Sequence, residues 1–240
     1  MRPADTRHRG PHPEDDRLFA PKWLPLMRQA VSELSWLLTR DYPSGAAVKL
    51  VGDRYAMTER QRWAVARASC ADASRARRIA KRLQPAEVSG RPIAIDGFNL
   101  IIILETALSG GVVLRGRDGA FRDLSSIHGT YRAVQETDRA IRLVAAALAP
   151  LTPGPVRWLF DQPVSNSGRL AARLRDLGAE LGLPWTAEVV MDPDRVLAVT
   201  SDVVVTADSA VLDRADAWLN LTELVLQAEP PAWLLDLSGD

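Results

Sequence analysis

Three short, mainly apolar runs, each followed within three residues by an aspartate, constrain the fold of this 240-residue chain more than any other feature. The runs and their aspartates are residues 93–95 with Asp96, residues 156–160 with Asp161, and residues 203–205 with Asp208. Runs of this kind are typical of strands that are buried on both faces of a parallel sheet. Stretches with helical spacing separate them, so the sequence predicts an α/β fold with helices on both faces of a mainly parallel sheet.

The other elements of this α/β part follow from local patterns. We predict a further strand over residues 187–191 and extend the last strand to residues 202–206. Leucines at helical spacing predict a helix over residues 167–182, and a second helical pattern covers residues 130–149. Asp118-Gly119 lies between two apolar segments and is typical of a β-hairpin turn.

The N-terminal part has a different pattern and is predicted to be a small all-α domain. Residues 21–40 have helical spacing, and Thr58 followed by Gln61 predicts a capping box for a helix that runs to about residue 71. Residues 46–51 form a short apolar piece, and residues 73–83 are interpreted as a further helical turn or a linker. The predicted boundaries are a disordered leader over 1–17, the helical domain over 18–90, the α/β domain over 91–228 and a tail over 229–240.

Charge divides the chain at the same place. The 30 Lys and Arg residues balance the 30 Asp and Glu residues, but residues 1–92 carry a net charge of +8 and residues 93–240 carry −8. The balance excludes a uniformly basic nucleic-acid-binding protein and an acidic disordered chain. Cys70 is the single cysteine, which excludes an intrachain disulfide, and no apolar run is long enough to span a membrane. These features favour a cytoplasmic protein.

The three aspartates that close the apolar runs predict a shared site. The carboxyl ends of parallel strands meet at one edge of a sheet, where ligands of α/β proteins bind. Clustered carboxylates repel one another unless a cation neutralises them, and Mg²⁺ and Mn²⁺ prefer oxygen ligands. We therefore expect Asp96, Asp161 and Asp208 to bind one or two divalent cations and to act in catalysis. In the alternative interpretation, each aspartate caps the helix that follows its strand.

The positions of other polar residues predict supporting or structural roles. Asp202 begins its strand and is expected at the opposite edge of the sheet, and Asp192 and Asp194 flank Pro193 as turn residues. Glu105 is a weaker acidic candidate, and His128 is interpreted as a loop residue. The residues expected to support the strand-end aspartates are Asn99, Ser209, Glu136 and Asp213.

Residues 165–169, Ser-Asn-Ser-Gly-Arg, follow the second apolar run and open a helix. Hydroxyl groups, backbone amides and a helix N-terminus favour an anion there, and Arg169 can pair with phosphate. Ser165, Ser167 and Arg169 are therefore candidate phosphate-binding residues. A plain helix cap with a flexible turn explains the same residues equally well. The segment lacks the Gly-Lys-Ser/Thr ending of a Walker A loop.

Short motifs in the α/β part resemble those of PIN-like and NYN-like nuclease domains. Residues 93–101, IAIDGFNLI, resemble the first strand of these domains, where Asn stands three residues after Asp. Residues 203–209, VVVTADS, resemble their late strand, and residues 156–161 are similar to an internal strand that Asp closes. Residues 51–72 resemble a prokaryotic helical domain of unknown function that is found fused to a PIN-like domain.

The resemblance implies a three-layer α/β/α nuclease domain over about residues 92–226. It implies that Asp96, Asp161 and Asp208 are metal ligands and that Asn99 supports them. It also implies that Ser209 contacts either phosphate or one of the metal-binding side chains. The further acid that PIN nucleases supply from a mid-chain helix would be Glu136. The hairpin at residues 118–119 is an addition to the usual pattern.

Three functions are compatible with these patterns. The first is a metal-dependent ribonuclease whose basic N-terminal part holds the RNA backbone through residues 75–82 and through Arg54, Arg60, Arg62 and Arg67. The second is an inactive module that binds RNA or a protein, and the third is an enzyme that acts on a small phosphorylated metabolite. The basic residues could instead be solvated or dock on the acidic domain of the same chain. No membrane partner is expected, and a homo-oligomer is left open.

Overall fold

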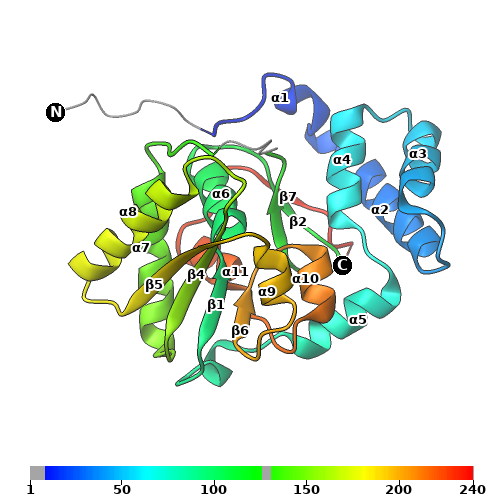
Figure 1. Ribbon diagram of the computed structural model, residues 1–240. Coiled ribbons are helices and arrows are strands. Elements are labelled where there is room, and N and C mark those ends of the chain that lie inside the picture. The colour runs from blue at the N-terminus through cyan, green and yellow to red at the C-terminus, as the bar shows by residue number, and fades with distance from the viewer. Residues whose placement is uncertain (1–8, 126–130, 240) are drawn as a thin grey trace.

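The computed structural model describes residues 9–125 and 131–239, and Figure 1 shows how their elements are arranged. An all-helical region over residues 15–81 precedes an α/β domain. This domain contains a four-stranded parallel sheet and a small three-stranded mixed sheet. The predicted fold class, α/β with a small all-α part in front, is confirmed.

Helices α3 and α4 and the turn η1 pack against the longest N-terminal helix, α2. The elements are α1 (Asp15–Leu18), the 3-10 turn η1 (Pro21–Trp23), α2 (Leu24–Leu38), α3 (Ser44–Arg54), α4 (Glu59–Ala68) and α5 (Asp72–Lys81). Helix α4 begins with the predicted capping box. The Thr58 hydroxyl accepts a hydrogen bond from the Gln61 amide, and the Gln61 side chain accepts one from the Thr58 amide. These bonds satisfy amides that lack partners in the first turn of a helix.

Two internal segments of the helical region differ from their predictions. The apolar piece over residues 46–51 lies inside α3, because Ala47 and Val51 are four residues apart and both enter the core shared with α2. Residues 73–83, interpreted as a helical turn or a linker, belong mostly to α5, a helix of ten residues.

The predicted disordered leader is wrong for its described part. Arg9 pairs with the buried carboxylate of Glu105, and its guanidinium lies 5.1 Å from the ring centroid of Tyr131. Asp15 is buried at the start of α1 and pairs with Arg60 at 2.5 Å. The chain from Arg9 onward is therefore held against the rest of the protein.

The main sheet is built from the predicted apolar runs. Its strands are β1 (Ile93–Asp96), β4 (Val156–Asp161), β5 (Trp185–Val190) and β6 (Val203–Val205). They are all parallel and lie in the order β5-β4-β1-β6. The chain moves from β1 to β4 to β5 in one direction and then crosses back to β6 on the other side of β1. The boundary between β1 and β6 is therefore the topological switch point, where ligands bind in open α/β sheets.

Helices cover both faces of this sheet. They are α6 (Gly97–Leu108), α7 (Thr137–Leu148), α8 (Ser167–Glu180), α9 (Pro193–Leu197), α10 (Ser209–Arg214) and α11 (Leu221–Ala228), with the 3-10 turns η2 (Pro85–Glu87) and η3 (Ala149–Leu151). In Figure 1, α9 and α10 lie in front of the sheet, whereas α6, α7 and α11 lie behind it. The core between the layers includes Ile95, Ile101, Trp158 and Leu174.

The small sheet joins the two parts of the chain. It consists of β2 (Val113–Arg115), β3 (Phe121–Asp123) and β7 (Leu234–Asp236) in the order β3-β2-β7, and β2 and β3 form the predicted hairpin. Strand β7 corrects the prediction of a tail after residue 228, because it pairs in parallel with β2. A second core packs Met27 and Leu34 of α2 against Leu114 of β2 and Leu235 of β7. No described helix is both long enough and apolar enough to cross a membrane.

Candidate functional site at the carboxyl ends of the parallel strands

Asp96 lies at the switch point, between the ends of β1 and β6. It is buried and caps α6 by accepting a hydrogen bond from the Asn99 amide at 3.3 Å. The Thr206 hydroxyl, directly after β6, donates to its second oxygen at 2.8 Å. The Asn99 side chain in turn accepts a hydrogen bond from the Ala207 amide at 2.8 Å. These bonds tie the end of β1 to the end of β6 and fix the Asp96 carboxylate.

The local sequence explains why α6 can start directly at Asp96. A Cβ atom on Gly97 would lie 2.3 Å from the Phe160 ring of β4, so only glycine allows this close approach. Each residue of the Asp-Gly-x-Asn motif therefore has a separate role. Asp96 caps α6, Gly97 allows the close contact with Phe160, and the Asn99 side chain binds the backbone directly after β6.

Asp96 lies in an environment that disfavours its charge. Burial raises its pKa to about 7, although the hydrogen bonds from Thr206 and Asn99 lower it. Repulsion from Asp194 and Asp161 raises the pKa further. The carboxylates from different strand ends are therefore close enough to influence one another.

Asp194 is the member of this group that the sequence interpretation missed. It lies on α9, which contacts β1 and β4 in front of the sheet. Partial desolvation raises its pKa to about 6, and repulsion from Asp208, Asp161 and Asp192 acts in the same direction. Its position after a third strand, β5, was the available signal, because that strand end faces the same edge of the sheet.

Asp161 and Asp208 complete the group of four aspartates, which we call the acidic edge: Asp96, Asp161, Asp194 and Asp208. Asp161 is half-buried at the end of β4, and desolvation and the charge of Asp192 raise its pKa. Asp208 is half-buried and accepts hydrogen bonds from the Ala210 and Val211 amides, at 2.8 and 3.0 Å, as the cap of α10. The sequence thus located three of the four carboxylates.

The alternative capping role is also present. Asp96, Asp192 and Asp208 each accept a hydrogen bond from an amide in the first turn of the following helix. A carboxylate has about four lone-pair directions, so a cap leaves it able to accept further ligands. Capping and ligand binding therefore do not compete for the whole side chain.

The acidic edge differs from the other acids of the chain in its lack of ion pairs. Elsewhere, Asp15 pairs with Arg60, Asp118 with Arg78 and Asp202 with Arg157. Within residues 9–125 and 131–239, none of the four acidic-edge carboxylates takes part in a salt bridge. Arg67 of α4 interacts electrostatically with Asp208.

The predicted three-carboxylate metal site is not formed as a compact group. In the part of the chain that the structure describes, no three His, Cys, Asp or Glu side chains are grouped so as to hold a metal ion. Asp96, Asp161 and Asp208 therefore share one edge without converging on a common point, and the charge of Asp194 acts on Asp96 while those of Asp161 and Asp208 act on Asp194. The predicted placement of Asp202 at the opposite edge agrees with its ion pair to Arg157, near the start of β4.

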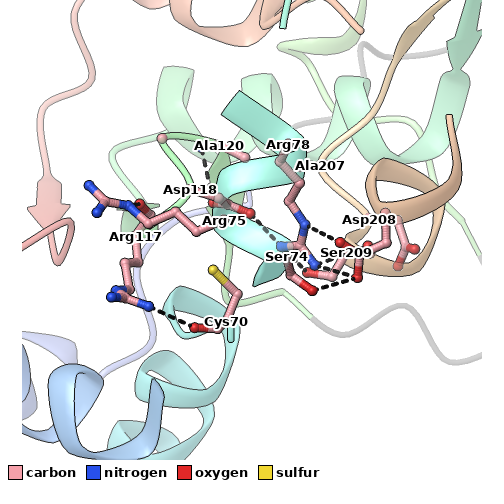
Figure 2. Close-up of polar contacts among 12 residues, drawn as sticks. Cys70, Ser74, Arg75, Arg78, Arg117, Asp118, Ala120, Ala207, Asp208 and Ser209 are labelled. Carbon is pink, nitrogen blue, oxygen red and sulfur yellow. Dashed lines mark hydrogen bonds and ion pairs between the residues drawn. The ribbon is translucent and has the colours of Figure 1, made fainter. Parts of the chain in front are cut away.

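Ser209 and Asp213, predicted to support the site, belong to a buried arginine network that adjoins Asp208 in the chain. Figure 2 shows Arg78, Asp118 and Ser209 of this network. Arg78 of α5 pairs with Asp118 at 2.6 Å and with Asp213 at 2.8 Å, and it donates to the Ser209 carbonyl at 3.1 Å. Arg122 of β3 also pairs with Asp118, at 2.7 Å, and these two cations hold the pKa of Asp118 well below its usual range.

This network connects the helical region to the segment that carries Asp208. Arg122 donates to the Ala207 carbonyl at 3.0 Å, and both Arg78 and Arg122 reach the Ser209 hydroxyl. Figure 2 shows Arg78 extending from α5 between the hairpin residue Asp118 and the start of α10. The arginines of α5 thus meet acids of the α/β domain, and Arg82 likewise pairs with Glu223.

The other arginines predicted to bind nucleic acid are mostly paired within the chain. Arg60 pairs with Asp15, Arg62 with Asp53 at 2.8 Å, and Arg67 with Asp123 at 3.5 Å. Arg54 is largely exposed and lies 3.6 Å from Glu33. Their charges are therefore partly compensated before any external ligand binds.

The predicted phosphate-binding residues lie at the start of α8, beside a cavity. Asn166 has a left-handed backbone conformation, with φ of 70°, and its side chain donates to the Tyr131 carbonyl at 2.8 Å. Ser167 is buried as the first residue of α8, whereas Ser165 is exposed and accepts a hydrogen bond from the Tyr131 amide through its carbonyl. Arg169 is exposed at the mouth of the cavity.

The remaining acidic candidates lie away from the acidic edge or inside the protein. Glu105 is fully buried and accepts hydrogen bonds from Tyr131 and Thr137, each at 2.5 Å, besides its pair with Arg9. Glu136 is buried at the residue before α7. His128 lies outside the described residues.

Comparisons with known proteins match the two-part organisation. A family model described as "Protein of unknown function (DUF434)" matches residues 26–81, and one described as "Domain of unknown function (DUF5616)" matches residues 85–224. The chain is 28% identical over 188 residues to "Uncharacterized protein MJ0935" of Methanocaldococcus jannaschii, covering 78% of this chain and 88% of the relative. No solved structure matches. Because the second family model covers more than half of the chain, this protein belongs to the DUF5616 family and carries a DUF434 region in front of that domain.

Proposed function

We propose that this protein is a metal-dependent phosphodiesterase that cleaves RNA at the acidic edge. The observation that carries the proposal is the group of four aspartates at the carboxyl edge of the sheet, whose carboxylates have no salt-bridge partner among the described residues. Their order along the chain and the Asp-Gly-x-Asn motif also resemble PIN-like nucleases. That resemblance is part of the proposal, and it favours RNA over a small substrate.

The chemistry of this donor set fits a hard divalent cation. All four side chains offer carboxylate oxygens, and repulsion among them would be relieved by Mg²⁺ or Mn²⁺. Mg²⁺ commonly binds one or two carboxylates and keeps several waters, so it does not need three converging ligands. Asp96, with Asp161 or Asp208, would hold the cation. When bound, such an ion stabilises charge on a phosphoryl oxygen and lowers the pKa of bound water.

The residues of the chain would have separate tasks in this reaction. Thr206 and Asn99 hold the Asp96 carboxylate at the centre of the edge. Asp194 is the most exposed of the four aspartates, and its pKa of about 6 suits a group that accepts a proton from an attacking water near neutral pH. Asn99 and the buried arginine network keep residues 207–209 in place beside it.

The test is cleavage of end-labelled single-stranded RNA with Mn²⁺ or with EDTA. We expect cleavage only with the metal, and we expect Asp96→Asn and Asp208→Asn each to lower the rate by at least about 100-fold, equal to about 3 kcal/mol of activation free energy. Asparagine keeps the helix caps, so folding is preserved. Asp202→Asn is the matched control, because it changes an aspartate at the opposite edge of the same sheet. Cleavage in EDTA, or equal rates in all variants, would contradict the proposal.

A second candidate is a module that binds RNA without cutting it. The observation in its favour is that Asp96 and Asp208 both cap helices, which gives them a structural reason to be present. In that case the protein retains the RNA in a filter-binding assay, shows no metal-dependent cleavage, and binds equally well as the Asp96→Asn variant.

A further inference from the structure

A cavity lies beside the start of α8. It has a volume of about 810 Å³ and opens between residues 131–135 and the first turns of α7 and α8. None of the four acidic-edge aspartates lines it. Residues 162–166 connect the end of β4, which carries Asp161, to the start of α8, which borders the cavity.

The charge of this cavity is positive and partly uncompensated. Arg132, Arg169 and Arg173 line it, together with one acid, Asp138. Arg173 is occupied by Asp138, to which it forms two hydrogen bonds. The guanidinium groups of Arg132 and Arg169, in contrast, form no ion pair within the described part of the chain. Two arginines facing one hollow without a carboxylate partner favour an anionic ligand.

The position of the cavity adds to this preference. It lies at the N-terminal ends of α7 and α8, which have 12 and 14 residues, and the aligned peptide dipoles give each end a partial positive charge. A phosphate group bound between Arg132 and Arg169 would therefore meet both side-chain and backbone attraction.

The remaining wall is partly polar, through Gln135, Thr137 and Asn166, and partly apolar. Ala133, Val134 and Leu170 line it, and Tyr131 forms its inner surface. The Tyr131 hydroxyl is fixed by the buried Glu105 carboxylate, and Phe98 packs on its ring with centroids 5.2 Å apart. A ligand that fits has a charged end and a flat or apolar body, and 810 Å³ is within the range of small-molecule sites.

We propose that this cavity binds a nucleoside monophosphate, with the phosphate paired to Arg132 and Arg169 and the base against the apolar wall. The site does not depend on the phosphodiesterase activity, because its residues are distinct from the acidic edge. A cavity of this kind next to a phosphodiester-cleaving centre would take either a product nucleotide or the end of a longer strand, and both present the same phosphate and base.

The test is isothermal titration of the full chain with AMP, adenosine and inorganic phosphate. We expect AMP to bind saturably and at least tenfold more tightly than adenosine or phosphate alone. The double variant Arg132→Gln, Arg169→Gln should weaken AMP binding by at least tenfold. Arg139→Gln is the matched control, because Arg139 is in the first turn of α7, near the cavity, but does not line it and pairs with Glu229. Thermal unfolding checks that all variants are folded.

The outcomes separate this proposal from the proposed activity. Unchanged AMP affinity in Asp96→Asn, together with loss in the double arginine variant, supports an independent nucleotide site. No saturable AMP binding, or equal affinity in the wild type and the double variant, overturns it. Equal affinities for AMP and inorganic phosphate also overturn it, because the apolar wall would then have no role.

Discussion

At the scale of single residues, Asp96 shows how much a motif can and cannot predict. The apolar run and the aspartate that closes it were sufficient to predict a carboxylate at the sheet edge. The hydrogen bond from Thr206 and the proximity of Asp194 depend on strands and loops more than 90 residues away, so no local pattern contains them. Asp194 follows β5, and that position was a signal for the same sheet edge, but it was missed because Asp-Pro-Asp is also an ordinary turn sequence.

The pKa of Asp96 leads to a prediction about stability without metal. Its folded pKa of about 7 is above the value of about 3.9 for an unfolded chain. The protonated form therefore stabilises the fold at low pH, and this contribution is lost as pH rises from about 4 to 7. Between pH 5 and 8, in EDTA, we expect the wild type to lose about 2–3 kcal/mol of unfolding free energy relative to Asp96→Asn.

Urea unfolding of both proteins at these two pH values measures this effect. The Asn side chain cannot ionise, so its stability should change less with pH than that of the wild type. Parallel pH dependence of the two unfolding free energies would show that Asp96 is not desolvated as described. Unfolding of Asp202→Asn at the same pH values supplies the control for a carboxylate that is already paired.

At the scale of elements, the start of α6 depends on contact between a glycine and an aromatic ring. Gly97→Ala would place a methyl group 2.3 Å from Phe160, inside a packed core, so the ring or the helix must move. We expect a loss of about 1–3 kcal/mol of unfolding free energy, measured in urea. Gly168→Ala, in the first turn of α8, has no atom within 4 Å of the added carbon and should be neutral or slightly stabilising. Equal effects of both changes would show that α6 is not packed this closely on β4.

Prediction of elements succeeded where local chemistry dominates and failed where pairing is distant. The capping box at Thr58 and the turn at residues 118–119 are local, and both are present. Strand β7 was assigned to a tail because it has only three residues and follows a Pro-Pro pair, so its sequence gives a weak strand signal. Leu235 and Leu237 are buried on either side of the half-buried Asp236, but the exposed Leu234 is also apolar, so the sequence does not show a clear alternation.

At the scale of the whole molecule, the opposite charges of the two sequence regions have a structural meaning. The +8 of residues 1–92 and the −8 of residues 93–240 meet at the contact between α5 and the α/β domain. The sequence could not decide whether these arginines bind RNA or the same chain, because both explanations require the same surface charge. In the structure, Arg78 is buried between Asp118 and Asp213, so its charge is unavailable to an external ligand. An RNA path to the acidic edge must therefore use other cations.

The last prediction concerns this contact as a stabilising unit. Arg78→Met removes a buried guanidinium and leaves Asp213 without its close partner, while Asp118 keeps Arg122. We expect a loss of about 3–5 kcal/mol of unfolding free energy in urea, because breaking one side of a buried ion pair leaves a desolvated charge. Arg77→Met, one residue earlier on α5, changes an exposed arginine that lies 3.8 Å from the same Asp213 and should cost less than about 1 kcal/mol.

Limited proteolysis gives a second measurement of the same contact. Because α5 contacts α10 directly, the Arg78 variant should expose α5 to trypsin before global unfolding, whereas the Arg77 variant should not. If the two variants are equally stable and equally resistant to trypsin, then α5 is held by its apolar contacts. The arginine network would then not stabilise the contact between the helical region and the α/β domain.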